Sequence, residues 1–364
     1  MLSTDSTFNR AGIWFLNSGI QQPNGGVARY YRSDLARYAR VSTEITGYAV
    51  STLLYAAERT GGGNYTDAAV RAARFLTRSA WNPELAVFPF EHSDNGDQPE
   101  PLAYFFDTGI IVRGLLAAWK ATREQEILDT AEAAGRAMMA DFRDGAALHP
   151  ILRLPMKQAR AYEPRWSAEP GCYQLKAALA WRELSAATGD SRFQAAWEEA
   201  LACALSAESA FLPGDTDREK IMDRLHAYCY FLEALLPCAG EPGCARALCE
   251  GIAKTSAYLT EIAPRFARSD VYAQLLRIRL CAAQTGVLPL DETAACSEAS
   301  QAHAFQLVSD DPRVAGGFSF GRKGLHLLPF VNPVSTSFCM QALAMWGDRH
   351  RDNATAHALL SSVI

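Results

Sequence analysis

Two aspartates stand directly ahead of long apolar segments, in positions from which they could act as acids or bases. Asp107 follows an aromatic run at 104–106, and Asp270 precedes a similar segment later in the chain. Apolar surroundings raise the pKa of a carboxyl group towards that of a general acid. Glu44 holds a comparable place before the first such segment. Glycoside cleavage needs two carboxyl groups, one to protonate the leaving oxygen and one to activate water or attack, so these three are candidate catalytic groups.

A histidine keeps a second chemistry open. His226 lies near Asp223 at the start of another apolar segment. Epimerisation of a sugar by proton removal uses His, Glu or Tyr groups on opposite faces of the ring, so His226 is a fourth catalytic candidate. A histidine in an apolar helix is commonly a hydrogen-bonded core residue, and a carboxylate at a first helical turn is commonly a cap. Tyrosines in comparable positions, which could contact a substrate together with Asp223, are Tyr48, Tyr173 and Tyr272.

Three connections between apolar segments are longer than compact domains usually contain, namely 88–102, 142–170 and 309–333. The last holds Arg322 and Lys323 in a glycine-rich stretch, where they could clamp a carboxylate or a phosphate. Two adjacent basic residues in a turn are more commonly a solvated surface pair. The other two connections supply a carboxylate and an aromatic ring as further candidates for substrate binding, Glu91 and Trp166.

These candidates need elements that bring them together, and the sequence pattern predicts helical hairpins. Long segments rich in Ala and Leu recur, each followed by a short turn and a segment with one charged face. Segments that are apolar nearly all round predict inner helices, and their polar-faced partners predict outer ones. The expected inner helices span 44–60, 106–122, 171–188, 222–236, 269–285 and 333–346. The expected outer helices span 65–77, 124–140, 191–207, 243–262, 291–307 and a short closing segment after Asn353.

Local signals mark the ends of these helices. Glycine after an inner helix, as at Gly61 and Gly189, predicts a left-handed C-cap, and Asn332 before a proline predicts an N-cap. Only 88–91 and 316–328 look extended, and both lie between hairpins.

A common register relates the candidate residues to the inner helices. Asp107, Tyr173 and Asp270 each stand fifteen residues before the threonine that ends an inner helix. If all inner helices run in one direction around a ring, these side chains surround the same mouth of a central cavity. A linear solenoid would use the same hairpins, but the number of pairs, six, favours the ring.

Six such hairpins resemble the (α/α)6 toroids of unsaturated glucuronyl hydrolases, N-acylglucosamine 2-epimerases and glucuronyl C5-epimerases. The phrase Ala-Ala-Thr-Gly-Asp at 186–190, with similar phrases at 283–286 and 58–61, is common in those repeats. The resemblance covers about 41–346 and implies an all-α fold with a preference for sugars. We expect a single domain, 1–364, in which 1–40 form an N-terminal extension and helix packed on the ring. The resemblance assigns no catalytic residues.

Composition narrows the class of protein further. The 364 residues include 35 basic and 40 acidic side chains without a basic stripe, which argues against a nucleic-acid partner. All nine cysteines lie from Cys172 onward in mostly apolar patterns, as reduced thiols do. The N-terminus has no export signal, and no run of roughly eighteen apolar residues predicts a membrane span. We therefore expect a cytoplasmic protein without a cofactor. A metal site is not expected, because no second Cys/His pair accompanies His226 and Cys229.

These observations predict a carbohydrate-active enzyme that hydrolyses a glycosidic bond of an acidic, uronate-type saccharide with paired carboxylates at the cavity rim. A sugar or uronosyl epimerase using His226, Glu44 and a tyrosine is the first alternative. A non-catalytic helical scaffold that binds a protein or a glycan is the second. The sequence predicts no particular oligomeric state.

Overall fold

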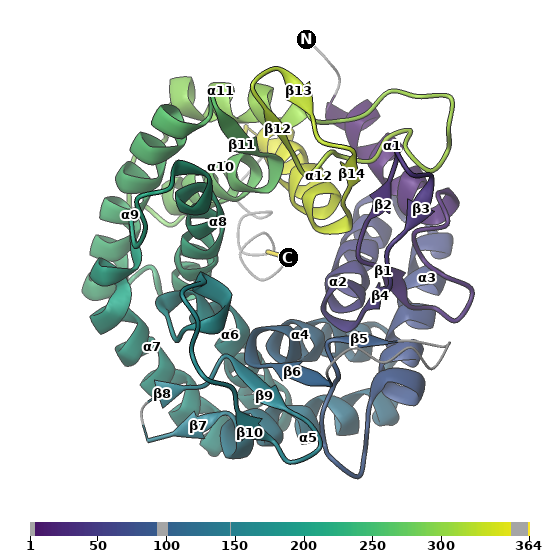
Figure 1. Ribbon diagram of the computed structural model, residues 1–364, viewed down its shortest axis with the longest axis vertical. Coiled ribbons are helices and arrows are strands. Elements are labelled where there is room, and N and C mark those ends of the chain that lie inside the picture. Colours follow the sequence, from purple (N-terminus) through teal and green to yellow (C-terminus); the bar gives the residue numbers. More distant parts are fainter. Residues whose placement is uncertain (1–3, 93–100, 146, 351–362) are drawn as a thin grey trace. The chain divides into compact units, whose positions relative to one another are not determined.

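The computed structural model describes residues 4–92, 101–145, 147–350 and 363–364. Within these ranges the chain folds into two compact units, and Figure 1 labels their helices and strands. Unit 1 contains Met1–Gly19, Tyr30–Arg37 and Glu208–Ile364, and unit 2 contains Ile20–Arg29 and Tyr38–Ala207. None of the helices in the described ranges is long and apolar enough to span a membrane. All nine cysteines are free thiols, as the sequence predicts.

Unit 2 alternates buried helices with half-exposed ones. Three helices are apolar and buried on nearly every side, and each is followed by an amphipathic partner, because only one face of the partner is covered. The buried helices are α2 (Thr43–Thr60), α4 (Phe105–Thr122) and α6 (Leu175–Thr188). Their partners are α3 (Gly63–Phe75), α5 (Gln125–Asp141) and α7 (Ser191–Phe211). Left-handed Gly61 and Gly189 close α2 and α6, which confirms both predicted C-caps.

Glycines inside the buried helices let their backbones approach closely. A Cβ on Gly114 of α4 would lie 2.5 Å from the carbonyl oxygen of Gly47 in α2, and a Cβ on Gly47 would lie 2.9 Å from the Cα of Ile111. On the other face of α4, a Cβ on Gly109 would lie 2.4 Å from the carbonyl oxygen of Ala177 in α6. Since no side chain larger than hydrogen fits at these points, the glycines fix how α2, α4 and α6 pack.

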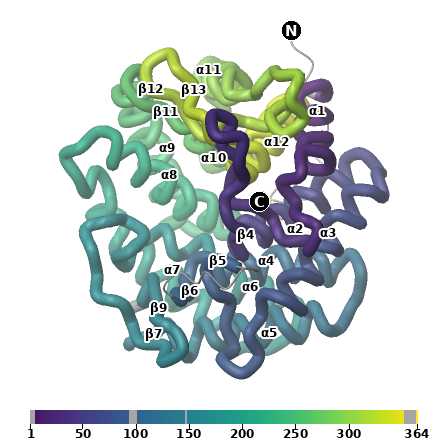
Figure 2. Tube along the Cα trace, turned by 45° about the vertical axis from the view of Figure 1, so that its right-hand side comes forward, coloured from purple at the N-terminus to yellow at the C-terminus, as the bar shows by residue number. Residues whose placement is uncertain are grey.

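Unit 1 uses the same alternation. The buried helices are α8 (Arg218–Leu235), α10 (Ser269–Gln284) and α12 (Pro333–Asp348). Their partners are α9 (Pro242–Ile262), α11 (Glu292–His303) and, packed against α12, the N-terminal helix α1 (Thr4–Asn17) (Figure 2). The predicted closing segment after Asn353 lies outside the described residues. The bounds of the other predicted helices agree with the structure to within four residues.

Short antiparallel strands connect the helices, and the sequence pattern missed most of them because two or three residues show no periodicity. The 88–91 stretch leads into β5 and the 316–328 stretch contains β12 and β13. In chain order the strands are β1 (Val27–Ala28), β2 (Tyr31–Arg32), β3 (Arg37–Tyr38), β4 (Val41–Ser42), β5 (Glu91–His92), β6 (Leu102–Tyr104), β7 (Arg143–Asp144), β8 (Ala147–Leu148), β9 (Ile151–Arg153), β10 (Gln158–Ala159), β11 (Phe266–Arg268), β12 (Gly321–Lys323), β13 (His326–Leu327) and β14 (Phe330–Val331).

These strands fix the starting points of the buried helices. In unit 2, β4 pairs with β1 and β5 and leads directly into α2, and β6 pairs with β9 and leads directly into α4. In unit 1, β11 pairs with β12 and leads into α10, and β14 pairs with β2 just before α12. At α12, the Asn332 side chain accepts a hydrogen bond from the Ser335 amide, which confirms the predicted N-cap. Glu44 therefore follows a strand paired at both edges, and Asp107 and Asp270 follow strands paired at one edge.

Candidate functional site

The predicted site residues divide equally between the two units. Unit 2 contains Glu44, Tyr48, Glu91, Asp107, Trp166 and Tyr173, and unit 1 contains Asp223, His226, Asp270, Tyr272, Arg322 and Lys323. The two aspartates taken together as acid and base, Asp107 and Asp270, belong to different units. Each unit brings its own aspartate together with other candidates, so the two groups are described in turn.

The first group centres on Glu44 and Asp107, here called the carboxyl pair. Glu44 lies in the first turn of α2 and Asp107 in the first turn of α4. Gly47, one turn after Glu44, packs against Ile110 and Ile111, one turn after Asp107, so the glycine contact aligns the two first turns. The Ser42 hydroxyl, accepting from the Ile45 amide at 3.3 Å, caps α2 in place of Glu44. Neither carboxyl is therefore needed as the hydrogen-bonding N-cap.

The carboxyl pair holds protons more tightly than ordinary carboxylic acids. Burial raises the pKa of Asp107 well above its usual range, and the negative charge of Glu44 raises it further. Burial also raises the pKa of Glu44, to about 7, against the opposing charge of Arg29. The Oδ2 atom of Asp107 is buried without a hydrogen-bond partner among the described residues. The charge of an ionised Glu44 therefore favours the protonated form of Asp107.

Aromatic rings surround the carboxyl pair. Asp107 raises the pKa of the Tyr173 and Tyr104 hydroxyls, after burial, so both tyrosines lie near it. The Tyr173 ring packs edge-on against Trp166, with ring centres 5.1 Å apart, and against Phe106 at 6.1 Å. Three predicted residues of unit 2, Asp107, Tyr173 and Trp166, therefore lie close together. Flat rings of this kind can stack on the apolar face of a sugar.

A basic edge lies beside the carboxyl pair, and the sequence pattern did not single out its main residue, Arg29. The Arg29 guanidinium lies 3.6 Å from a carboxylate oxygen of Glu91 and over the Phe90 ring at 5.1 Å. Arg40 lies 3.4 Å from the other oxygen of Glu91. The two arginines share the carboxylate of Glu91. Both arginine side chains are more than two-fifths exposed, so an incoming anion can reach them.

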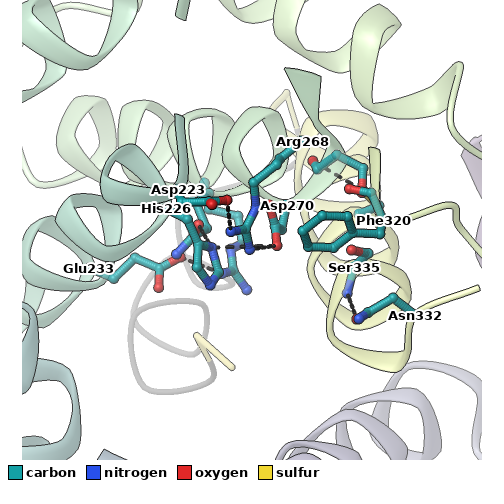
Figure 3. Close-up of polar contacts among 12 residues, drawn as sticks. Asp223, His226, Glu233, Arg268, Asp270, Phe320, Asn332 and Ser335 are labelled. Carbon is teal, nitrogen blue, oxygen red and sulfur yellow. Dashed lines mark hydrogen bonds and ion pairs between the residues drawn. The ribbon is translucent and has the colours of Figure 1, made fainter. Parts of the chain in front are cut away.

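The second group lies in unit 1 and is joined by hydrogen bonds and ion pairs. It is here called the arginine network and contains Asp223, His226, Arg268, Asp270 and Gln274, all but the last of which are labelled in Figure 3. Arg268 is the last residue of β11. Its Nη2 and Nε atoms donate to both carboxylate oxygens of Asp270, at 2.6 and 3.0 Å, and its Nη1 donates to Asp223 at 2.9 Å. Burial alone raises the pKa of Asp270, but the charge and hydrogen bonds of Arg268 bring it below its usual value.

His226 completes the arginine network as a neutral base. Its Nδ1 lies 2.8 Å from the Gln274 amide oxygen and 3.5 Å from an Asp270 oxygen. Burial and the nearby charge of Arg268 lower the pKa of His226 to about 4. Because Nδ1 faces two oxygen atoms, the proton of the neutral ring belongs on Nδ1 and the lone pair on Nε2.

Deeper in unit 1, a second buried ion pair joins α8 and α10. Arg277 donates to Glu233, and both side chains are completely buried. Arg277 also donates to the Gln341 side chain of α12 at 2.7 Å and lies over the Phe338 ring at 4.2 Å. The amide of Ile364 donates to the same Gln341 oxygen at 3.2 Å. These contacts tie the three buried helices of unit 1 to each other.

The remaining predicted residues of unit 1 lie apart from the arginine network. Tyr272 and Arg322 face a pocket between α9, α10 and α11. Lys323, the neighbour of Arg322, is exposed and donates to Glu219 at 2.7 Å. The two basic residues therefore do not form a joint clamp. Within the described ranges, no group of three or more His, Cys, Asp or Glu side chains is arranged to hold a metal ion.

Sequence reasoning missed the arginines that set the charge of both groups. Arginines are mostly solvated, so Arg29 and Arg268 do not stand out by type. Arg268 did have a signal, because it stands two residues before a candidate aspartate in the sequence Phe-Ala-Arg-Ser-Asp. Glycines inside apolar helices, such as Gly47 and Gly114, were a second unused signal of close backbone approach.

Comparison with solved structures establishes the fold class. A D-mannose isomerase aligns over 94% of this chain and 96% of its own, with a TM-score of 0.72 and 9% identity. A sugar epimerase from a ruminal bacterium covers 94% of this chain and 97% of its own, with a TM-score of 0.70 and 13% identity. A glycoside hydrolase family 76 mannosidase from Bacteroides thetaiotaomicron covers 93% and 98%, with a TM-score of 0.57 and 12% identity. The predicted (α/α)6 fold is therefore confirmed. No family model and no curated protein matches the sequence.

Proposed function

We propose that this protein is a carbohydrate-active enzyme that hydrolyses a glycosidic bond with the carboxyl pair. One observation carries the proposal: the buried Asp107 and the half-buried Glu44 lie in the first turns of two helices in close contact, and the pKa values of both are raised, that of Asp107 partly by the charge of Glu44. Retaining and inverting glycosidases both need one protonated and one ionised carboxyl group. Solved structures of similar fold include a mannosidase, so the fold is compatible with this chemistry.

The order of ionisation assigns the roles within the carboxyl pair. Asp107 is the acid that gives its proton to the leaving oxygen, because burial and the Glu44 charge keep it protonated. Glu44 is the carboxylate that activates water or attacks the sugar, and it becomes ionised as the pH rises through about 7. The half-buried ring of Trp166 offers a stacking surface for the sugar, and the buried Tyr173 ring packs against it.

The substrate class follows from the charges beside the carboxyl pair. The Arg29 side chain is nearly half exposed, and its charge lowers the pKa of both Glu44 and Asp107, so it lies near the carboxyl pair. An acidic sugar of the uronate type would present its carboxylate to this guanidinium, since guanidinium groups bind carboxylates strongly. Arg29 therefore replaces the predicted pair Arg322 and Lys323 as the residue that recognises the acid group.

Replacement of the proposed acid tests this function. Asp107→Asn should lower turnover of uronate-containing oligosaccharides by about 100- to 10,000-fold, the usual contribution of general acid catalysis, with an unchanged melting curve. Asp129 of α5 is exposed and offers a matched control, because Asp129→Asn makes the same change far from any buried carboxyl and should leave turnover intact. Product masses report hydrolysis directly. Full turnover in Asp107→Asn would reject the role of the carboxyl pair.

A sugar epimerase is the second candidate, and the state of His226 favours it. The pKa of His226 is lowered to about 4, so its ring is neutral near pH 7, and a neutral imidazole can accept a proton. Two solved structures of similar fold are a sugar epimerase and a D-mannose isomerase. Reaction in deuterated water separates the candidates, because epimerisation by proton removal places deuterium on a sugar carbon without cleavage. Deuterated, uncleaved product that disappears in His226→Asn would establish this alternative.

A further inference from the structure

A pocket of unit 1 that the proposed reaction does not use lies between α9, α10, α11 and β12. It has a volume of about 350 Å³, and its walls combine apolar side chains of α9 and α10 with polar side chains of α11. Tyr272 and Arg322 face it together, and Phe305 packs behind both of them. None of the residues of the arginine network lines this pocket.

One buried hydrogen-bond donor at this pocket has no partner in the described part of the chain. The Nε atom of Arg322 is buried there without a hydrogen-bond partner. A buried donor left without a partner is costly, and native structures contain few of them. The Arg322 Nε therefore indicates a missing acceptor, and Tyr272, which is 8% exposed and lines the same pocket, has a hydroxyl that could donate to it.

The Arg322 guanidinium is held in position before any ligand arrives. Arg322 lies in β12, paired with Ala267 of β11 and with Leu327 of β13. Its Nη2 donates to the Gln301 side chain at 2.8 Å, and its guanidinium lies 5.5 Å from the centre of the Phe305 ring. A side chain fixed by packing and hydrogen bonds loses less freedom on binding a ligand.

The charges around the pocket favour an anion. The one carboxylate on the pocket wall, Glu298, is bound by Arg279, whose Nη2 lies 2.6 Å from a Glu298 oxygen. Burial raises the pKa of Glu298, and Arg279 opposes this shift. Among the described residues, no carboxylate forms an ion pair with Arg322. Guanidinium groups form their strongest hydrogen bonds with carboxylates and phosphates.

We infer that this pocket is a second ligand site, which binds a small hydroxylated carboxylate of the size of a single sugar acid. The carboxylate would accept from Arg322 and Tyr272, and the polar residues Thr260, Ser297 and Gln301 would meet the hydroxyl groups. The inference rests on unit 1 alone and does not depend on the proposed function of the carboxyl pair in unit 2.

Hydrogen exchange with a defined probe tests this site. D-Glucuronate added to the full-length wild-type chain should slow amide exchange in 256–264 and 294–301, the α9 and α11 segments that line the pocket. D-Glucose, which lacks the carboxylate, should do so much less. Arg322→Gln should weaken the binding of glucuronate at this site at least about tenfold, since a charged hydrogen bond is lost. Absence of protection in the wild-type chain would overturn the inference.

Matched variants separate binding from folding and from turnover. Lys323→Gln removes the adjacent positive charge, which faces Glu219, and should keep the protection. Tyr272→Phe removes only the hydroxyl and should weaken binding by a smaller factor than Arg322→Gln. Asp107→Asn should retain full protection, so loss of the proposed reaction cannot be confused with loss of this site. Equal protection in Arg322→Gln and wild-type protein would contradict the inference.

Discussion

Asp107 and Asp270 occupy equivalent places in the two units and yet have opposite properties. Each lies in the first turn of a buried helix that follows a short strand. The residue at the N-cap is Tyr104 in α4 and Arg268 in α10. Without a cation bonded to it, Asp107 has a raised pKa, whereas the bidentate contact of Arg268 lowers the pKa of Asp270. Both aspartates are buried, so burial alone does not decide the direction of the pKa shift. The presence or absence of a cation bonded to the carboxyl group decides it.

The same contrast separates the carboxyl pair, to which we assign catalysis, from the arginine network, to which we assign stability. In the carboxyl pair, burial and the Glu44 charge raise the pKa of Asp107 by more than the nearby Arg29 lowers it. The arginine network keeps its charges because each finds an opposite charge or an amide within hydrogen-bond distance. We accordingly place the proposed proton transfer in unit 2 and expect a stabilising role for Arg268 in unit 1.

The largest expected effect comes from breaking the arginine network at Arg268. Arg268→Leu leaves Asp270 buried without its counter-charge, which should reduce the free energy of unfolding by about 3–5 kcal/mol. The double variant Arg268→Leu/Asp270→Leu should lose less, because no unpaired charge remains in the core. Urea unfolding of both variants measures the difference. An Arg268→Leu variant as stable as the wild type would show that Asp270 resembles Asp107 after all.

A smaller effect should follow from pushing apart the helices that carry the carboxyl pair. Gly114→Ala places a methyl group 2.5 Å from the Gly47 carbonyl oxygen, so α2 and α4 must separate. We expect a loss of about 1–3 kcal/mol of stability, as for other overpacked cores, together with a lower pKa of Asp107 as Glu44 moves away. The control is Gly63→Ala at the start of α3, where a Cβ meets no atom within 4 Å. Thermal unfolding of the two variants should differ clearly, and identical curves would exclude a tight contact.

The smallest of the three effects concerns the pH dependence of stability. The pKa of His226 is about 4 in the folded chain and near 6.5 when unfolded, so only the unfolded chain takes up this proton between those values. Lowering the pH from 7 to 5 should therefore cost the wild type about 2 kcal/mol through His226. His226→Asn should lack this contribution. The comparison needs urea unfolding of both proteins at both pH values, and equal losses would show that the ring is protonated in the folded state.

Sequence alone predicted the helices well and the partners of the candidate residues poorly. Apolar segments such as the one after Asp107 define a helix over 18 residues, a length at which periodicity is informative. Helix α1 was assigned only to an N-terminal extension, and its place as the partner of α12 depends on contacts between the two ends of the chain. Arg268 lies within hydrogen-bond distance of Asp270, and Gln274 within hydrogen-bond distance of His226. Spacing along the sequence does not predict such contacts. Tyr272 and Arg322 line a pocket between α9, α10 and α11 that the sequence did not predict.

The central claim is that Glu44 and Asp107 share a proton near neutral pH, and a 13C NMR titration of their carboxyl carbons tests it most directly. Signals are assigned by their absence in Glu44→Gln and Asp107→Asn. Glu44 should titrate with a midpoint near 7, Asp107 should remain protonated after Glu44 has ionised, and Glu44→Gln should lower the pKa of Asp107. If both groups instead ionise near pH 4, as exposed carboxyl groups do, the carboxyl pair cannot act as the acid and the account is contradicted.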